Sequence, residues 1–415
     1  MKYYLTIIIL VGQIFFNCTE RNRLNPFDPE GKIKSPIQLS ISPSGHSARL
    51  NWSIQDITDF KGFRLYRARD DNNFILLADL SPQTRSYSDT LLDYYHWYQY
   101  RIAILGYQNE SLPSEPVRFY PGPGKVWLLT RYGYSIRQLS YDLLHSSKVY
   151  NTNYPPISWD LDLGREEIWL AHAQYRYISK MNISLGYEDF FLQNDFQQPM
   201  DIKRDSNSDR IIVLDSRGKA LFLLENQTVR DSIALDRDNY FKMMVTNNSQ
   251  IIAMNDNSAR IFEAEGDSLY RINFEDGFRG ADMMLQDSLL YVLISNATSS
   301  QSQLITFNRS SQQLMHLNLT GIFTLIGKPA DKNYLYLSEV INSNSTRLVK
   351  LSLEGNRLLE LPVLAGNIDD IAINQNDNSI IVLQRYQNNL VLYDSLGQII
   401  STNNQIYDPI KITIQ

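Results

Sequence analysis

QQPMDIKRDSNSDRIIVLDSRGKALFLL, the sequence of residues 197–224, contains three short apolar runs in close succession. The runs are PMDIK, IIVLD and ALFLL, and the residues between them are mainly Asp, Ser, Asn, Arg, Gly and Lys. Runs of about five residues that are rich in Ile, Val and Leu and are bounded by turn-forming residues are typical of β-strands. The stretch therefore predicts three consecutive strands joined by short turns.

The middle run of this stretch recurs along most of the chain. Its equivalents begin, in chain order, at Val126 (VWLLT), Ile168 (IWLAH), Ile211 (IIVLD), Ile251 (IIAMN), Leu290 (LYVLI), Leu335 (LYLSE) and Ile380 (IIVLQ). Most copies follow an inner run, such as WDLDL or KMMVT, and precede two further runs. Successive starts lie 39 to 45 residues apart. A period of about 40–45 residues with several strands in each unit is the signature of a β-propeller blade.

The two ends of the repeat region complement each other. The run at Val126 has no inner run before it, whereas the run DPIKITI at residues 408–414 has none after it. Pairing these ends completes a seventh unit and removes two exposed strand edges. We therefore expect a seven-bladed β-propeller over residues 125–415, with six blades as the alternative. The repeat units resemble those of NHL- and YVTN-like propeller families.

Residues 35–121 show a different pattern. Apolar and polar residues alternate in segments such as ARLNW and FRLYR, which is typical of a β-sandwich. The order and spacing of Pro36, Trp52, GFRLYR, Leu92, Tyr98 and SLPSEPV resemble a fibronectin type III domain. The PGPG sequence at residues 121–124 marks the end of this domain, because Pro and Gly are rare inside a strand ladder. The expected fold class is thus all-β, a fibronectin type III β-sandwich followed by a propeller.

The N-terminus is expected to carry an export signal. Lys2 precedes an apolar stretch at residues 3–16, which is shorter than the roughly 18–20 residues that cross a bilayer. Cys18, the only cysteine, follows directly and resembles the acylated cysteine of bacterial lipoproteins. This resemblance implies a signal peptide at residues 1–17, a lipidated tether at residues 18–34, and a protein anchored to a membrane of the bacterial cell envelope. An ordinary secretory signal with an unmodified cysteine is the alternative.

The composition limits the possible functions. The net charge of −6, without a basic cluster, argues against a nucleic-acid partner. The five histidines are scattered, and no metal-binding, phosphate-binding or nucleophile motif occurs. We therefore expect no metal, no cofactor and no catalytic residues that a local motif would identify.

Aspartates recur at the predicted inner strands, at Asp160, Asp201, Asp282, Asp369 and Asp370. Carboxylates around a propeller channel can bind a cation or act as acid and base. They can equally accept hydrogen bonds from neighbouring backbone N–H groups at a repeated position. The repetition favours the second interpretation.

The loops on the face where the inner strands begin are rich in Tyr and Arg, which offer large contact areas with polar ends. The candidate binding residues are Tyr134, Tyr175, Arg176, Arg279, Arg385 and Tyr386, and the same loops also contain Tyr132, Arg217, Phe278 and Tyr407. The leading hypothesis is a non-catalytic binding or assembly module that recognises an envelope protein or a glycan. Two alternatives are a lyase or hydrolase that acts on a sugar or lactone in the channel, and a scaffold within an envelope complex.

Overall fold

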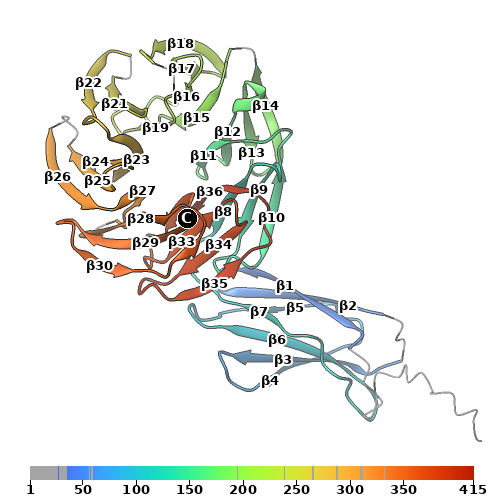
Figure 1. The fold of residues 1–415 in the computed structure, drawn as a ribbon. Coiled ribbons are helices and arrows are strands. Elements are labelled where there is room, and N and C mark those ends of the chain that lie inside the picture. Colours follow the sequence, from blue (N-terminus) through green and yellow to red (C-terminus); the bar gives the residue numbers. More distant parts are fainter. Residues whose placement is uncertain are drawn as a thin grey trace, which may run out of the picture. The chain divides into compact units, whose positions relative to one another are not determined.

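The computed structural model describes Phe27 and residues 35–415, except 56, 58, 194, 238, 264–265, 287, 309–311 and 331. The predicted signal peptide, Cys18 and the tether, apart from Phe27, lie outside the described residues. The chain divides into two compact units: the first ends at Pro121 and the second begins at Gly122. The described elements are β-strands and a single turn of 3-10 helix, η1 (Ala173–Tyr175) (Figure 1). None of these elements is a helix with the length and apolar character needed to cross a membrane.

The first unit contains two antiparallel sheets. One sheet has the order β1-β2-β5 and the other β4-β3-β6-β7. Their bounds are β1 (Ile37–Ser44), β2 (Ser47–Ile54), β3 (Gly62–Arg69), β4 (Ile75–Leu80), β5 (Ser86–Asp89), β6 (Tyr98–Leu105) and β7 (Val117–Phe119). Alternate residues of β2 are buried because they face one shared core. In this core the rings of Trp52 and Phe63 pack edge to face, with their centres 5.7 Å apart. The hydroxyl of buried Tyr98 accepts a hydrogen bond from the backbone N–H of Asp93 at 3.1 Å.

The described residues of the second unit form seven antiparallel sheets, which are arranged around a central opening (Figure 1). The inner strands, one from each sheet, are β11 (Ser158–Asp162), β15 (Pro199–Arg204), β19 (Lys242–Val245), β23 (Arg279–Gln286), β27 (Ile322–Gly327), β32 (Asp370–Ile373) and β36 (Pro409–Ile414). The second strands are β12 (Glu167–His172), β16 (Ile211–Asp215), β20 (Ile251–Met254), β24 (Leu289–Asn296), β28 (Tyr334–Asn342), β33 (Ile380–Gln384) and β8 (Val126–Thr130).

Two further strands complete each sheet on its outer side. The third strands are β13 (Tyr177–Asn182), β17 (Ala220–Glu225), β21 (Ser258–Phe262), β25 (Gln301–Phe307), β29 (Ser345–Ser352), β34 (Asn389–Tyr393) and β9 (Ser135–Leu139). The outer strands are β14 (Tyr187–Gln193), β18 (Thr228–Ala234), β22 (Ser268–Asn273), β26 (Gln313–Thr320), β30 (Arg357–Glu360), β35 (Ile399–Asn403) and β10 (Ser146–Asn151), and the short β31 (Leu364–Ala365) also pairs with β29.

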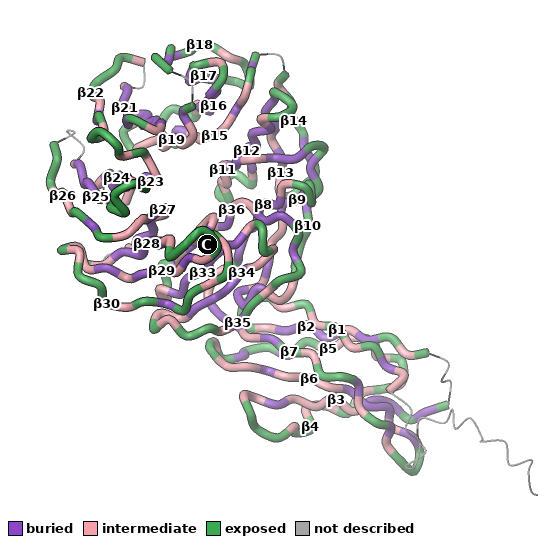
Figure 2. Tube along the Cα trace, in the orientation of Figure 1, coloured by how far each residue is buried: buried purple, intermediate pink, exposed green. Residues whose placement is uncertain are grey.

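Burial explains why the second strands are apolar throughout. Every residue of β16 is buried, whereas most residues of the outer strand β18 are exposed (Figure 2). Both faces of each sheet contact a neighbouring sheet, so a strand in the middle of the sheet has no solvent-facing side. The result is a series of separate cores, each lying between two consecutive sheets.

The first and last strands of the second unit share one sheet. The C-terminal strand β36 pairs with β8, and Ile414 lies opposite Val126 while Ile412 lies opposite Leu128. This pairing confirms the prediction that the run near the C-terminus supplies the missing inner strand of the first repeat.

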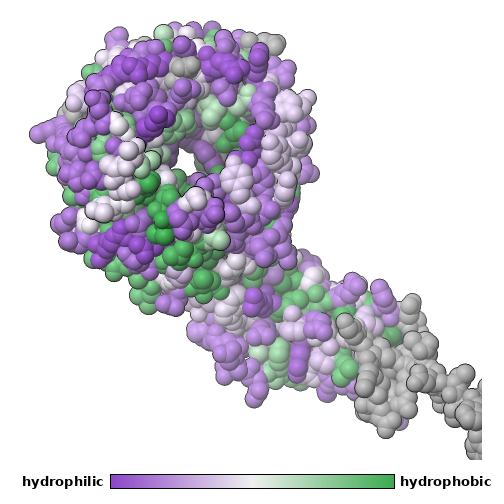
Figure 3. Space-filling model, in the orientation of Figure 1, coloured by the Kyte–Doolittle hydropathy of each residue, from purple (hydrophilic) through white to green (hydrophobic). Residues whose placement is uncertain are grey.

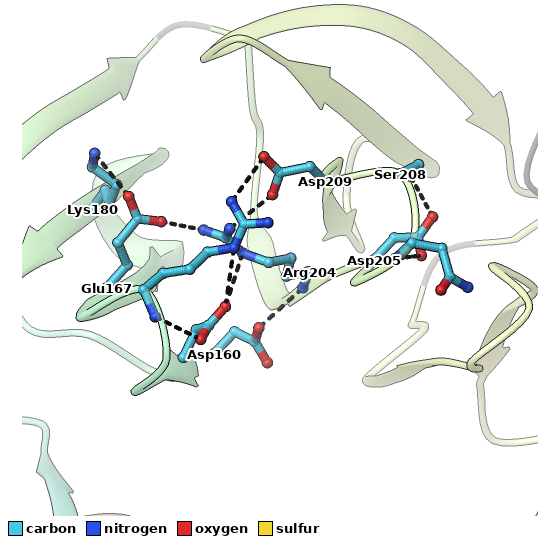
Figure 4. A network of polar contacts seen from close by, with 10 residues as sticks. Asp160, Glu167, Lys180, Arg204, Asp205, Ser208 and Asp209 are labelled. Carbon is cyan, nitrogen blue, oxygen red and sulfur yellow. Dashed lines mark hydrogen bonds and ion pairs between the residues drawn. The ribbon is translucent and has the colours of Figure 1, made fainter.

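Charged side chains also connect consecutive sheets. Arg204 on β15 contacts Glu167 on β12 and donates to Asp209 Oδ1 at 2.8 Å, while Lys180 Nζ on β13 lies 3.3 Å from Glu167 Oε1 (Figure 4). The backbone N–H of Arg204 donates to Asp160 Oδ2 at 3.1 Å. The side chain of Arg204 is only 7% exposed, so its contacts to carboxylates compensate for its burial.

Candidate functional site

A pocket of about 850 Å³ lies at the centre of the second unit, where the surface is hollowed (Figure 3). Each inner strand contributes to its wall, through Trp159, Asp201, Lys242, Asp282, Leu325, Asp370 and Lys411. Turns between the second and third strands contribute Arg131, Gln174, Arg176, Arg217 and Arg385. A smaller pocket of about 250 Å³ shares Lys242, Asp282, Leu325 and Asp370 with it. The two pockets therefore meet at the ring of inner strands.

The aspartates of the inner strands are hydrogen-bonded to the backbone. Asp201 accepts the N–H groups of Ile202 and of Met243, the latter on the next inner strand, each at 3.0 Å. Asp282 accepts the N–H of Ile326 at 3.0 Å, and Asp370 accepts that of Ile412 at 2.9 Å. Each carboxylate therefore joins one inner strand to the next.

Asp160 has the same role toward Arg204, and Asp369 accepts the backbone N–H of Arg385 at 2.7 Å. The interpretation of the recurring aspartates as acceptors for backbone N–H groups is confirmed.

Lysines neutralise part of this acidic ring. Lys242 pairs with Asp282, while Lys411 donates to Ser158 Oγ at 2.7 Å and lies 3.6 Å from Asp201 Oδ1. Burial opposes the charge on Lys242, but the carboxylate of Asp282 outweighs it and raises the pKa of this lysine. Burial lowers the pKa of Lys411 despite the nearby carboxylate of Asp201, because Lys203 and Lys242 also lie close to it.

Asp370 and Asp201 differ in their electrostatic surroundings. Burial raises the pKa of Asp370, although the N–H of Ile412 and the charge of Lys411 act in the opposite direction. Asp201 is also buried, but Lys411 and Lys203 together with its hydrogen bonds lower its pKa. Asp201 is therefore the more firmly ionised of the two carboxylates.

Four arginines line the pocket, and three of them make no ion pair within the described part of the chain. Arg385 donates from Nε to Asp408 Oδ1 at 2.6 Å. Arg131, Arg176 and Arg217 make no ion pair with any residue that the structure describes. The guanidinium of Arg131 lies 5.0 Å from the ring centre of Tyr132, and its buried Nε has no hydrogen-bond partner among the described atoms. We call Arg131, Arg176 and Arg217 the arginine arc.

The sequence-predicted binding residues divide into two groups. Arg176 and Arg385 line the pocket. The other four are exposed and lie outside its lining: Tyr134, Tyr175, Arg279 and Tyr386. Tyr175 packs against Tyr154 with ring centres 4.4 Å apart, and Arg279 pairs with Asp256 at 3.6 Å.

Sequence reasoning did not select Arg131, Lys242 or Lys411 as site residues. A usable signal lies in the four-residue turns after β8, β16 and β33, each of which ends in a residue with positive φ: Tyr134, Lys219 and Asn388. The pocket-lining arginines Arg131, Arg217 and Arg385 occupy the first or second position of these turns.

One buried cluster resembles a set of catalytic groups but is inaccessible. His172 Nε2 lies 2.9 Å from Ser179 Oγ, which donates to Glu188 Oε1 at 2.6 Å. His172 and Ser179 are both 0% exposed, and neither lines the central pocket. Burial lowers the pKa of His172 to about 4, so the ring is neutral at physiological pH. No group of His, Cys, Asp and Glu suited to a metal ion occurs in the described part of the chain.

Comparison with solved structures identifies the fold of the second unit. Hydrazine synthase from Kuenenia stuttgartiensis matches with a TM-score of 0.54 and 10% identity, over 72% of this chain and 93% of that chain. A functionally unknown protein from Desulfotomaculum acetoxidans matches with a TM-score of 0.55 and 10% identity, over 70% and 98% of the two chains. Virginiamycin B lyase from Staphylococcus aureus matches with a TM-score of 0.50 and 12% identity, over 61% of this chain and 85% of that chain.

These structural neighbours are β-propeller proteins. The second unit is a β-propeller. At these identities the similarity concerns the fold of the propeller alone. No protein-family model matches the chain, and no curated protein sequence does so either.

Proposed function

We propose that this chain is an exported, membrane-anchored lipoprotein of the bacterial cell envelope, in which one face of a seven-bladed propeller binds a ligand without catalysing a reaction. The seven blades correspond to the seven sheets, each of which contributes an inner strand to the pocket wall. The two-sheet arrangement of the first unit, its Trp52–Phe63 contact and the bond from Asp93 N–H to Tyr98 support a fibronectin type III-like domain.

The division of charge in the pocket is the observation that carries this proposal. The carboxylates of Asp201, Asp282 and Asp370 are engaged by backbone N–H groups and hold the inner strands together. Among the basic groups of the lining, those of the arginine arc make no ion pair within the described chain. Arginine stays protonated at neutral pH, so it binds anions but does not exchange protons with a substrate. This chemistry favours recognition over catalysis.

A channel lyase or hydrolase that acts on a sugar or lactone is the second candidate. It is favoured by the pocket residues Asp370, whose pKa is raised, and Lys411, whose pKa is lowered. A carboxyl and an amine shifted in these directions are the kind of groups that transfer protons in active sites.

Binding and turnover can be separated with the purified full-length protein and soluble fractions of the bacterial envelope. We expect a retained ligand whose mass is unchanged after elution. Binding should be lost in an Arg176→Ala/Arg217→Ala variant and kept in Asp370→Asn. A ligand released with altered mass by the wild type, but not by Asp370→Asn, would establish the enzyme instead.

A further inference from the structure

We infer that the arginine arc binds a carboxylated oligosaccharide, such as a short chain of uronic acid units. The inference rests on the proposed binding function and names the class of ligand that the pocket mouth accepts.

The pocket lining carries an excess of basic groups, although the chain as a whole is acidic. The chain carries a net charge of −6, yet the pocket lining contains six basic and four acidic side chains. Arg204 and Arg357 show how this chain balances an arginine with carboxylates: Arg204 contacts Glu167 and Asp209, and Arg357 contacts Glu339 and Glu360. Arg131, Arg176 and Arg217 have no such partner within the described chain, so an anionic ligand would supply the missing counter-charge.

The spacing of the arc favours a ligand with several negative charges. Arg131 follows β8, Arg176 follows η1 after β12, and Arg217 follows β16. These second strands belong to three consecutive sheets, which share cores pairwise. Three consecutive sheets thus each contribute one arginine of the arc to the pocket lining, so the arc follows part of the ring of sheets. An oligomer with one carboxylate on each unit matches this arc better than a single small anion does.

The groups between and below the arginines are suited to sugar rings. Gln174, Gln197 and Gln198 line the same side of the pocket, and an amide can donate to and accept from hydroxyl groups. Trp159 and Phe241 supply aromatic surface to the lining. A volume of about 850 Å³ falls within the range of roughly 300–1,000 Å³ that is usual for small-ligand pockets.

One buried carboxylate organises this part of the mouth. Asp215 is 0% exposed, and it accepts the backbone N–H of Gln198 and that of Gly218, each at 2.8 Å. Asp215 therefore holds the loop that carries Gln197 and Gln198 against the turn that carries Arg217. Such preorganisation lowers the entropic cost of binding.

The test is calorimetric titration of the full-length protein in detergent with trigalacturonate. Methyl-esterified trigalacturonate serves as the uncharged match, and triglutamate as the acidic peptide. We expect trigalacturonate to bind with an affinity that falls as salt is raised, and the ester and the peptide to bind at least about tenfold more weakly. Equal binding of the ester would refute the role of the carboxylates. Tighter binding of triglutamate would refute the assignment of an oligosaccharide as the ligand.

Variants separate the arc from the remainder of the face. Arg176→Ala/Arg217→Ala should weaken trigalacturonate binding at least about tenfold, whereas the Lys/Lys version, which keeps the charges but not the planar forks, should weaken it less. Arg279→Ala is the matched control, because Arg279 is exposed and lies outside the pocket. An equal loss with Arg279→Ala, or none with the double alanine variant, would refute the assignment.

Failure of the inference is distinguishable from failure of the proposed function. If trigalacturonate does not bind but the wild type still retains an envelope ligand unchanged, the ligand class is wrong and the binding function stands. If neither is bound, both are wrong.

Discussion

The carboxylate of Asp201 accepts the backbone N–H of Met243 at 3.0 Å and thereby joins inner strand β15 to inner strand β19 across the gap between two sheets. The same carboxylate accepts from Ser158 on the preceding inner strand, β11, at 2.5 Å. One short side chain thus connects three inner strands at the pocket wall. Asp282 and Asp370 repeat the link to the following strand.

Removing this link should destabilise the propeller. Asp201→Ala leaves the backbone N–H of Met243 and the hydroxyl of Ser158 without their buried acceptor, and it removes the carboxylate nearest to the ammonium of Lys411. A buried donor left without its acceptor typically costs about 1–3 kcal/mol. We expect urea denaturation to show a loss of this size, while Asp256→Ala, which removes a half-exposed carboxylate, changes the unfolding free energy little. A smaller loss for Asp201 than for Asp256 would contradict this role.

Deleting residues 408–415 should destabilise the whole propeller. The deletion removes β36, so β8 loses its inner neighbour and Asp370 loses the N–H of Ile412. The exposed edge of β8 would favour aggregation. Differential scanning calorimetry should show a marked fall in the Tm of the propeller, with the transition of the first unit as an internal reference. An unchanged propeller Tm would show that β36 is dispensable.

His172 should make stability depend on pH. Its folded-state pKa of about 4 lies below that of an unfolded histidine, so the unfolded chain binds the proton more readily and stability falls as pH decreases between about 6.5 and 4. This term corresponds to a loss of about 2 kcal/mol between pH 7 and pH 5. Denaturation at both pH values should show the loss in the wild type and a smaller one in His172→Gln. An identical pH dependence of the two proteins would exclude His172 as its source.

Cys18→Ser tests the predicted lipid anchor. We expect the wild-type protein to lose its signal peptide, to carry acyl chains on Cys18 and to fractionate with membranes, because several acyl chains give stable anchoring. The variant should lack the lipid mass shift and appear in the soluble fraction. Unchanged mass and fractionation in Cys18→Ser would favour an ordinary secretory signal.

Most of the strand architecture could be predicted from the sequence because it follows from local patterns. The apolar runs at Ile211 and Ile380 form strands in which every residue is buried, as expected for strands covered on both faces. The unmatched runs at the two ends of the repeat also sufficed to predict that β36 pairs with β8. The repeated aspartates indicated a structural role, although their partners on the following strands could not be seen in the sequence.

The site was only partly open to prediction, because the turn positions of Arg131, Arg217 and Arg385 are a local pattern, whereas the convergence of these turns is not. Composition singled out arginines and tyrosines in the turns, but only the position of each residue within its turn, and the arrangement of the sheets around one opening, decide which of them line the pocket. Arg131 and Tyr134 lie three residues apart in one turn, yet Arg131 lines the pocket and Tyr134 does not. The local sequence determined the strands, because each buried strand corresponds to an apolar run that recurs every 39 to 45 residues. The tertiary structure alone determined the arginine arc, because it brings together side chains that lie more than 40 residues apart in the sequence.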